Sequence, residues 1–153
     1  MAQVTGIVLA GGRGSRMGSV DKGLQPLRGK PMVAWVLERL APQVDEIVLN
    51  ANQNLEAYAG FGHRVVPDSL GGFAGPLAGL HAGLQAAAHS LAVTVPCDSP
   101  FLPLDLVRLA DGAALSLEAP IAAFFALSNR MANMISMRPN DEFYLLGRVP
   151  KPK

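Results

Sequence analysis

A short apolar run that stops at two glycines is the feature that most constrains how this chain can fold. Residues 6–10 read GIVLA and are followed at once by Gly11 and Gly12. A continuous β-branched run of this length is typical of a strand buried on both faces, as strands are in a parallel sheet. Parallel strands are joined by crossovers, so this run predicts helices between it and further strands.

The first two-thirds of the chain continues that pattern of short strands and helices. By their apolar spacing we expect further strands at residues 46–50, 64–67 and 91–95, and helices at residues 30–40, 79–89 and 104–115. Strands that alternate with helices through short turns predict an α/β fold with a mainly parallel sheet and helices on both faces. Ligands of such sheets bind beyond the carboxyl ends of the strands.

Composition excludes several classes of function. The 153 residues suit one domain, and no apolar run reaches the roughly 18 to 20 residues of a membrane-spanning helix. Thirteen basic and twelve acidic residues without a block of one sign predict no nucleic-acid binding and no membrane partner. Since the N-terminus carries no basic leader and Cys97 is the single cysteine, we expect a cytoplasmic protein.

The C-terminal third has a less regular pattern. We expect a single domain over residues 1–153, in which residues 112–153 form an atypical or truncated part. Three methionines at helical spacing, Met131, Met134 and Met137, are interpreted as a packed stripe rather than a cofactor site. Residues 150–153 are expected to be frayed.

The segment LAGGRGSRMGSVDKG, residues 9–23, follows the first strand directly and predicts an anion site. Its glycines allow sharp turns that aim several backbone N–H groups into one concavity, which suits phosphate oxygens. Arg13, Arg16 and Lys22 add positive charge. The segment is not a Walker A loop, because Lys22 is followed by Gly23 instead of serine or threonine, and it lacks the third glycine of the dinucleotide fingerprint.

Three polar residues stand at strand ends, where a ligand is expected. Asp98 follows an apolar strand and is interpreted as an oxygen ligand for a hard cation that bridges phosphates, with a helix cap as the alternative. For Asn50 and Asp68, the residues alone are equally well explained by an ordinary turn after a strand. Cys97 is interpreted as a packed thiol rather than a nucleophile, because no histidine motif accompanies it. The three histidines lack metal-ligand spacing and are expected to be structural or surface residues: His63, His81 and His89.

Four ordered motifs together resemble a known family. LAGGRGSRMGSVDKG is similar to the signature of pyrophosphorylase-type nucleotidyltransferases, and the Asp21-Lys22 pair resembles the molybdenum cofactor guanylyltransferase branch. The other motifs are VLNAN at residues 48–52, PDSLGGFAGPLAGL at residues 67–80 and VPCDSPFLP at residues 95–103. The resemblance covers residues 4 to about 110 and implies a three-layer α/β/α, Rossmann-like nucleotidyltransferase domain.

The resemblance also implies roles for individual residues. The implied catalytic residues are Arg16, Lys22 and Asp98, and Asp98 is also the implied Mg²⁺ ligand. The implied nucleotide-binding residues are Leu9, Ala10, Gly11, Gly12, Gly14, Lys22, Asn50, Asp68 and Asp98. The turn that opens the helix after Asp68 matches the family at Gly75, Pro76, Leu77 and Gly79.

The activity implied by the resemblance is transfer of GMP from GTP to molybdopterin, with release of pyrophosphate. The implied partners are GTP, molybdopterin or molybdenum cofactor, and proteins that handle that cofactor. Two alternatives stay open: a related transferase that uses CTP or UTP with another phosphorylated acceptor, and a GTP-binding protein with degenerate catalysis. Beyond about residue 111 the resemblance ends, and the family's late Asn-x-Asn-Thr-Pro stretch on the pterin side has no counterpart.

Overall fold

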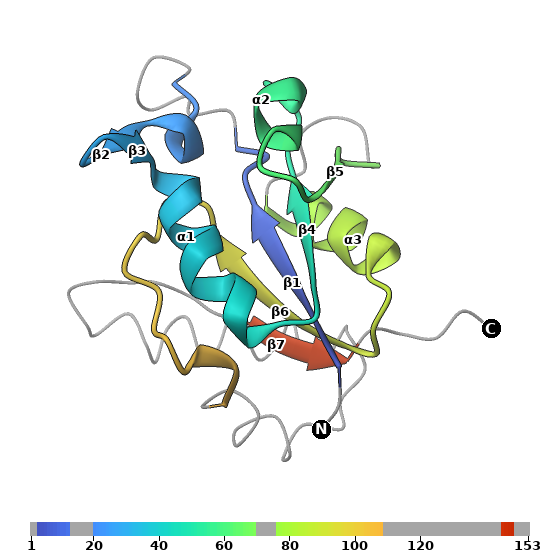
Figure 1. Ribbon diagram of the computed structural model, residues 1–153. Helices are drawn as coiled ribbons and strands as arrows, with labels where there is room; N and C mark the ends of the chain where they lie inside the picture. Colours follow the sequence, from blue (N-terminus) through green and yellow to red (C-terminus); the bar gives the residue numbers. More distant parts are fainter. Residues whose placement is uncertain (1–2, 13–19, 70–75, 109–144, 149–153) are drawn as a thin grey trace, which may run out of the picture.

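The computed structural model describes residues 3–12, 20–69, 76–108 and 145–148. Its main element is a five-stranded sheet in the order β5-β4-β1-β6-β7 (Figure 1). The strands of this sheet are β1 (Val4–Leu9), β4 (Glu46–Asn50), β5 (Arg64–Val66), β6 (Leu91–Pro96) and β7 (Leu145–Arg148). The helices are α1 (Met32–Leu40), α2 (Leu55–Ala59) and α3 (Pro76–Ala86), with 3-10 turns η2 (Lys22–Leu24) and η3 (Ala41–Gln43).

The first four strands of the sheet are parallel, as the sequence predicts. β1 lies in the centre between β4 and β6, and β4 also pairs with β5. Their carboxyl ends therefore meet at one edge, toward which the arrowheads of β1 and β4 point in Figure 1. β7 runs antiparallel to β6. The expectation of a mainly parallel sheet is confirmed.

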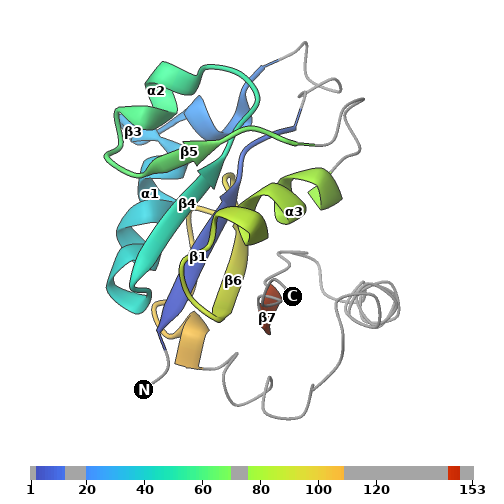
Figure 2. The same cartoon turned by 90° about the vertical axis from the view of Figure 1, so that its right-hand side faces the viewer.

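Helices cover both faces of the sheet, so the three-layer α/β/α expectation is also confirmed (Figure 2). Neighbouring residues of β1 point to opposite faces, and each meets a different helix. A Cβ atom at Gly6 would approach Leu40 of α1, whereas Ile7 lies against Gly83 of α3. The absence of a side chain at Gly6 and Gly83 allows these helices to approach β1 closely.

The core between α1 and the sheet is formed by apolar side chains at helical spacing on α1 and at alternate positions on the strands. Its fully buried members include Val8, Val33, Val36, Leu40, Leu49, Tyr58, Val93 and Val95. No helix within the described ranges is both long and apolar enough to span a membrane.

The predicted helix at residues 30–40 begins two residues later than expected. Lys30 and Pro31 instead form β3 (Lys30–Pro31), which pairs antiparallel with β2 (Pro26–Leu27). Arg28 and Gly29 form the turn between them with positive φ values of 50° and 86°. The Trp35 indole N–H donates to the Leu27 carbonyl at 2.9 Å and fixes this hairpin against α1.

Other boundaries also differ from the sequence expectations. The helix expected at residues 79–89 spans Pro76–Ala86, because Pro76 is suited to a first helical turn. The helix α2 and the strand β7 are not predicted from the sequence. For residues 104–115, the structure describes only the beginning, where residues 106–108 are helical. The methionine stripe and residues 150–153 lie outside the described residues.

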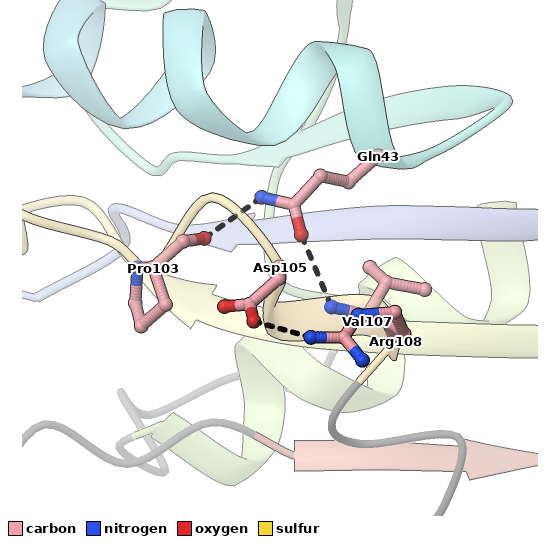
Figure 3. Close-up of polar contacts among 5 residues, drawn as sticks. All are labelled: Gln43, Pro103, Asp105, Val107 and Arg108. Carbon is pink, nitrogen blue, oxygen red and sulfur yellow. Dashed lines mark hydrogen bonds and ion pairs between the residues drawn. The ribbon is translucent and has the colours of Figure 1, made fainter.

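The segment that follows β6 is fastened to the end of α1 by side chains (Figure 3). The Gln43 amide donates to the Pro103 carbonyl at 2.9 Å and accepts from the Val107 N–H at 3.1 Å. Arg39 donates to the Leu102 carbonyl at 3.0 Å. These bonds fix the path of the chain after Asp98, which leaves the carboxyl edge of the sheet and returns along α1.

Candidate functional site

The ends of three neighbouring strands bring the predicted nucleotide-binding residues together. Leu9 is in register with Asn50 on β4 and with Pro96 on β6. The Ala10 N–H donates to the Asn50 carbonyl at 2.7 Å, and the Cys97 N–H donates to the Leu9 carbonyl at 3.1 Å. Because β1 is the strand from which the chain goes first to one side of the sheet and later to the other, this edge is the topological switch point where α/β sheets bind ligands.

A cluster of amide and carboxylate groups lies on the β4 side of this edge. The buried Asn50 amide donates to Asp68 Oδ1 at 2.9 Å and to the Val66 carbonyl at 3.2 Å. Asn52 donates to the Gly11 carbonyl at 3.1 Å and accepts from the Asp68 N–H at 2.8 Å. The structure therefore joins Asn50 to Asp68, two of the residues singled out from the sequence, and adds Asn52 to them.

Asn52 is a member of this cluster that sequence reasoning did not single out. It lies inside the VLNAN motif, two positions after Asn50, and that repeated asparagine is the signal that could have identified it.

Gly11 has no room for a side chain within this cluster. A Cβ atom there would lie 2.8 Å from both Asn50 Oδ1 and Asn52 Nδ2, and 3.5 Å from Asp68 Oδ1. Among the residues that the structure describes, apart from its chain neighbours, none lies within 4 Å of a Cβ atom placed at Gly12. The described polar groups at the end of β1 thus crowd Gly11 and not Gly12.

A charged pair lies on the β6 side of the same edge. Lys22 Nζ is 3.8 Å from Asp98 Oδ2, and the side chains are 49% and 36% exposed. An ion pair with this exposure stabilises the fold by at most about 1 kcal/mol. Both groups are therefore available to a charged ligand at little cost in folding free energy.

Asp98 has the chemistry of a ligand for a hard cation. In the part of the chain that the structure describes, no three His, Cys, Asp or Glu side chains gather into a metal site. Mg²⁺ in nucleotide enzymes is commonly held by one or two carboxylates and by the substrate phosphates, with water completing the shell. Asp98, as one accessible carboxylate at this edge, fits that mode rather than a metal cage made only of protein groups.

Cys97 has the environment of a packed thiol, as predicted. Burial raises the pKa of the Cys97 thiol to about 12, and the negative charges of Asp98 and Asp21 act in the same direction. The thiolate that a nucleophile needs is therefore disfavoured near neutral pH.

The remaining sequence candidates are distributed around this edge or lie outside the described residues. Gly14 and Arg16 are among the latter, as is Gly75. Ser69 Oγ and His81 Nδ1 are 3.2 Å apart on the exposed surface. Gly79 begins the second turn of α3 and faces Asn50 and Leu9.

Comparisons with known proteins agree with this geometry. A family model described as the MobA-like NTP transferase domain matches residues 6–140. A molybdenum cofactor guanylyltransferase from Cupriavidus pinatubonensis is 56% identical over 124 residues, which cover 77% of this chain and 62% of that protein. The chain thus spans about three fifths of the length of the curated relatives that it matches.

Solved structures of similar fold include two related proteins. Molybdopterin-guanine dinucleotide biosynthesis protein A from Archaeoglobus fulgidus is 28% identical with a TM-score of 0.55, covering 69% of this chain and 52% of that one. A protein from Mycobacterium tuberculosis in complex with manganese is 25% identical with a TM-score of 0.54, covering 71% and 58%. The family match, the sheet order and the strand-end cluster agree, and the chain belongs to the family of MobA-like NTP transferase domains.

Proposed function

We propose that this chain transfers GMP from GTP to molybdopterin and releases pyrophosphate. The observation that carries the proposal is the strand-end site, in which the backbone at Gly11 and Gly12 lies between the Asn50–Asp68 cluster and the Lys22–Asp98 pair. The choice of guanine and of molybdopterin is supported by the 56% identity to a protein named molybdenum cofactor guanylyltransferase.

The reaction is a direct displacement at the α-phosphorus of GTP. An oxygen of the terminal phosphate of molybdopterin forms the new bond to that phosphorus, and the bond to the bridging oxygen of the β-phosphate breaks. Pyrophosphate leaves with the electron pair of that bond. The attacking phosphate is already ionised near neutral pH, so the step requires no protein base and no covalent protein intermediate.

The residues of the chain bind, orient and neutralise charge in this step. The Lys22 ammonium group, half exposed at the end of the glycine-rich segment, offers a positive charge to the departing pyrophosphate. We expect backbone N–H groups at Gly11 and Gly12 to bind the phosphates. Asn52 holds the Gly11 carbonyl, and the bonded Asn50 and Asp68 side chains would lie beside the nucleoside. Such positioning is the main source of catalysis in phosphoryl-type transfers.

A magnesium ion would be held by Asp98. When bound, it supplies Lewis-acid stabilisation of the phosphate oxygens. The Asp98 carboxylate would then exchange its weak contact with Lys22 for the cation, which leaves the lysine free to pair with phosphate.

Pyrophosphate release by the purified chain tests the proposal. The assay compares GTP with CTP and UTP, each with Mg²⁺ and molybdopterin, and repeats the GTP measurement without acceptor. We expect release only with GTP and acceptor together. Equal release with CTP would contradict the guanine assignment, and tight GTP binding without release would favour the binding-protein alternative.

A further inference from the structure

Tyr58 of α2 is completely buried, and its hydroxyl group contacts the glycine-rich segment. Tyr58 Oη donates to Asp21 Oδ1 at 2.5 Å, and Asn54 Nδ2 donates to Asp21 Oδ2 at 3.0 Å. Both carboxylate oxygens of Asp21 are therefore bound by side chains of one short helix and the residue before it. Burial and the bond to Asp21 raise the pKa of the Tyr58 hydroxyl, which stays protonated as the donor.

Gly23, two residues after Asp21, lies against the same hydroxyl group. A Cβ atom at Gly23 would lie 2.6 Å from Tyr58 Oη and 3.1 Å from Cys97 Cβ. Gly23 follows Lys22, and Cys97 precedes Asp98. Tyr58 thus lies against both chain neighbours of Lys22, Asp21 and Gly23, and Gly23 in turn lies against Cys97, the neighbour of Asp98.

The pair itself cannot supply its own geometry. Its atoms are 3.8 Å apart and both side chains are well exposed, so their attraction is weak. The position of Lys22 must come from how its backbone is held. The 3-10 turn contributes only two longer bonds, from the N–H groups of Leu24 and Gln25, both at 3.2 Å.

The geometry points to Tyr58 as a positioning residue for Lys22. Its hydroxyl group binds the carboxylate of Asp21, the residue before the lysine. The same hydroxyl leaves room only for a glycine at position 23, the residue after the lysine. The lysine is thereby directed across the strand-end site toward Asp98. This inference rests on the proposed function for the role of Lys22 toward phosphate, but the positioning itself is a property of the free protein.

A buried tyrosine hydroxyl needs a hydrogen-bond partner wherever it lies, so a purely structural role is the alternative. Tyr58→Phe keeps the ring and removes the hydroxyl. Thr5→Val is a matched control, because it removes another buried hydroxyl that donates to a carboxylate, from Thr5 Oγ1 to Glu46 Oε2 at 2.8 Å, at the opposite edge of the sheet.

Amide hydrogen exchange of the free protein tests the positioning. We expect the amides of residues 22–25 to exchange about five-fold faster or more in Tyr58→Phe, and to be unchanged in Thr5→Val. Asn54→Gly should give a smaller change of the same sign, since glycine accepts the positive φ of 52° at that position while losing the amide. Unchanged exchange in both Tyr58→Phe and Asn54→Gly would overturn the inference.

Calorimetric binding of MgGTP tests whether the effect passes through Lys22. We expect Tyr58→Phe to weaken binding about ten-fold, Thr5→Val to leave it unchanged, and Tyr58→Phe to have no further effect in a Lys22→Ala background. An equal loss in both backgrounds would show a structural role and overturn the inference. If the unmodified chain binds no MgGTP, the proposed function fails, and the exchange rates alone decide the positioning.

Discussion

Replacing Gly79 by alanine adds one methyl group against the side chain of Asn50. Gly79 lies on the face of α3 that contacts the sheet, and its Cβ atom would overlap Asn50 Oδ1 and lie 3.0 Å from Asn50 Cγ and 3.2 Å from Leu9 Cδ2. Because the helix and the strand end are both buried, the amide must rotate or α3 must move outward. Rotation separates Asn50 from Asp68 and Val66, its two hydrogen-bond acceptors.

Two opposing contributions determine the change in the free energy of unfolding. Alanine is favoured over glycine within a helix by about 1 kcal/mol. Overpacking of a buried contact costs about 1–3 kcal/mol, and weakening the bond from Asn50 to a carboxylate adds about 1 kcal/mol or more. We therefore expect Gly79→Ala to lower the free energy of unfolding by about 1–3 kcal/mol, or Tm by about 2–12 °C for a domain of this size.

Gly83→Ala is a matched control on the same helix. Its Cβ atom would lie 2.5 Å from Ile7 Cγ2, so it also overpacks a buried contact, but against an apolar side chain in the middle of β1. Both variants should lose stability in thermal unfolding. Only Gly79→Ala should weaken MgGTP binding, by about ten-fold, because only it displaces a polar group of the site.

Two results would refute this reasoning. Wild-type stability and MgGTP affinity in Gly79→Ala would show that the Asn50 side chain can move at no cost in free energy and that its observed position does not matter for binding. Equal losses of affinity in Gly79→Ala and Gly83→Ala would show that binding responds to the packing of α3 as a whole instead of to Asn50.

Three further predictions concern the other side of the site. Lys22→Ala should lower turnover by at least about ten-fold while Tm stays unchanged, because the side chain is half exposed and contributes charge rather than packing. Unchanged turnover in a steady-state assay of pyrophosphate release would remove Lys22 from the mechanism. Asp98→Ala should abolish magnesium-dependent chemistry but leave some metal-free GTP binding, and full magnesium-dependent activity would identify Asp98 as a turn residue. In the folded protein the Cys97 thiol should react slowly with a thiol reagent at pH 8 and faster as the pH rises above 9, since its pKa is raised to about 12. The unfolded chain should react quickly, and rapid reaction of the folded protein at pH 8 would contradict the packed environment.

The central strands and the strand-end residues could be predicted from the sequence because they follow from local patterns. The strand β4 has the predicted bounds, since its apolar run is continuous and ends at a polar Asn50. The alternation of strands and helices also predicted that these strands run parallel, and their parallel direction brings Asn50, Asp68 and Asp98 to one edge.

Elements that depend on distant contacts could not be predicted in this way. Lys30 and Pro31 have the composition of a helix start, but pairing with β2 and the bond from Trp35 to Leu27 place them in a hairpin. The strand β7 joins the sheet antiparallel to β6 from more than 45 residues later in the chain, a separation across which periodicity carries no information.

The Asp21-Lys22 dipeptide illustrates the same limit within the site. In the sequence, Asp21 is the carboxylate nearest to Lys22. In the structure, its oxygens accept from Tyr58 and Asn54, which are 37 and 33 residues away. Lys22 instead faces Asp98, at the end of a different strand. Asp21 thus helps to hold the backbone at Lys22 and does not pair with the ammonium group. We therefore expect changes in α2 to alter nucleotide binding although α2 contains none of the predicted nucleotide-binding residues.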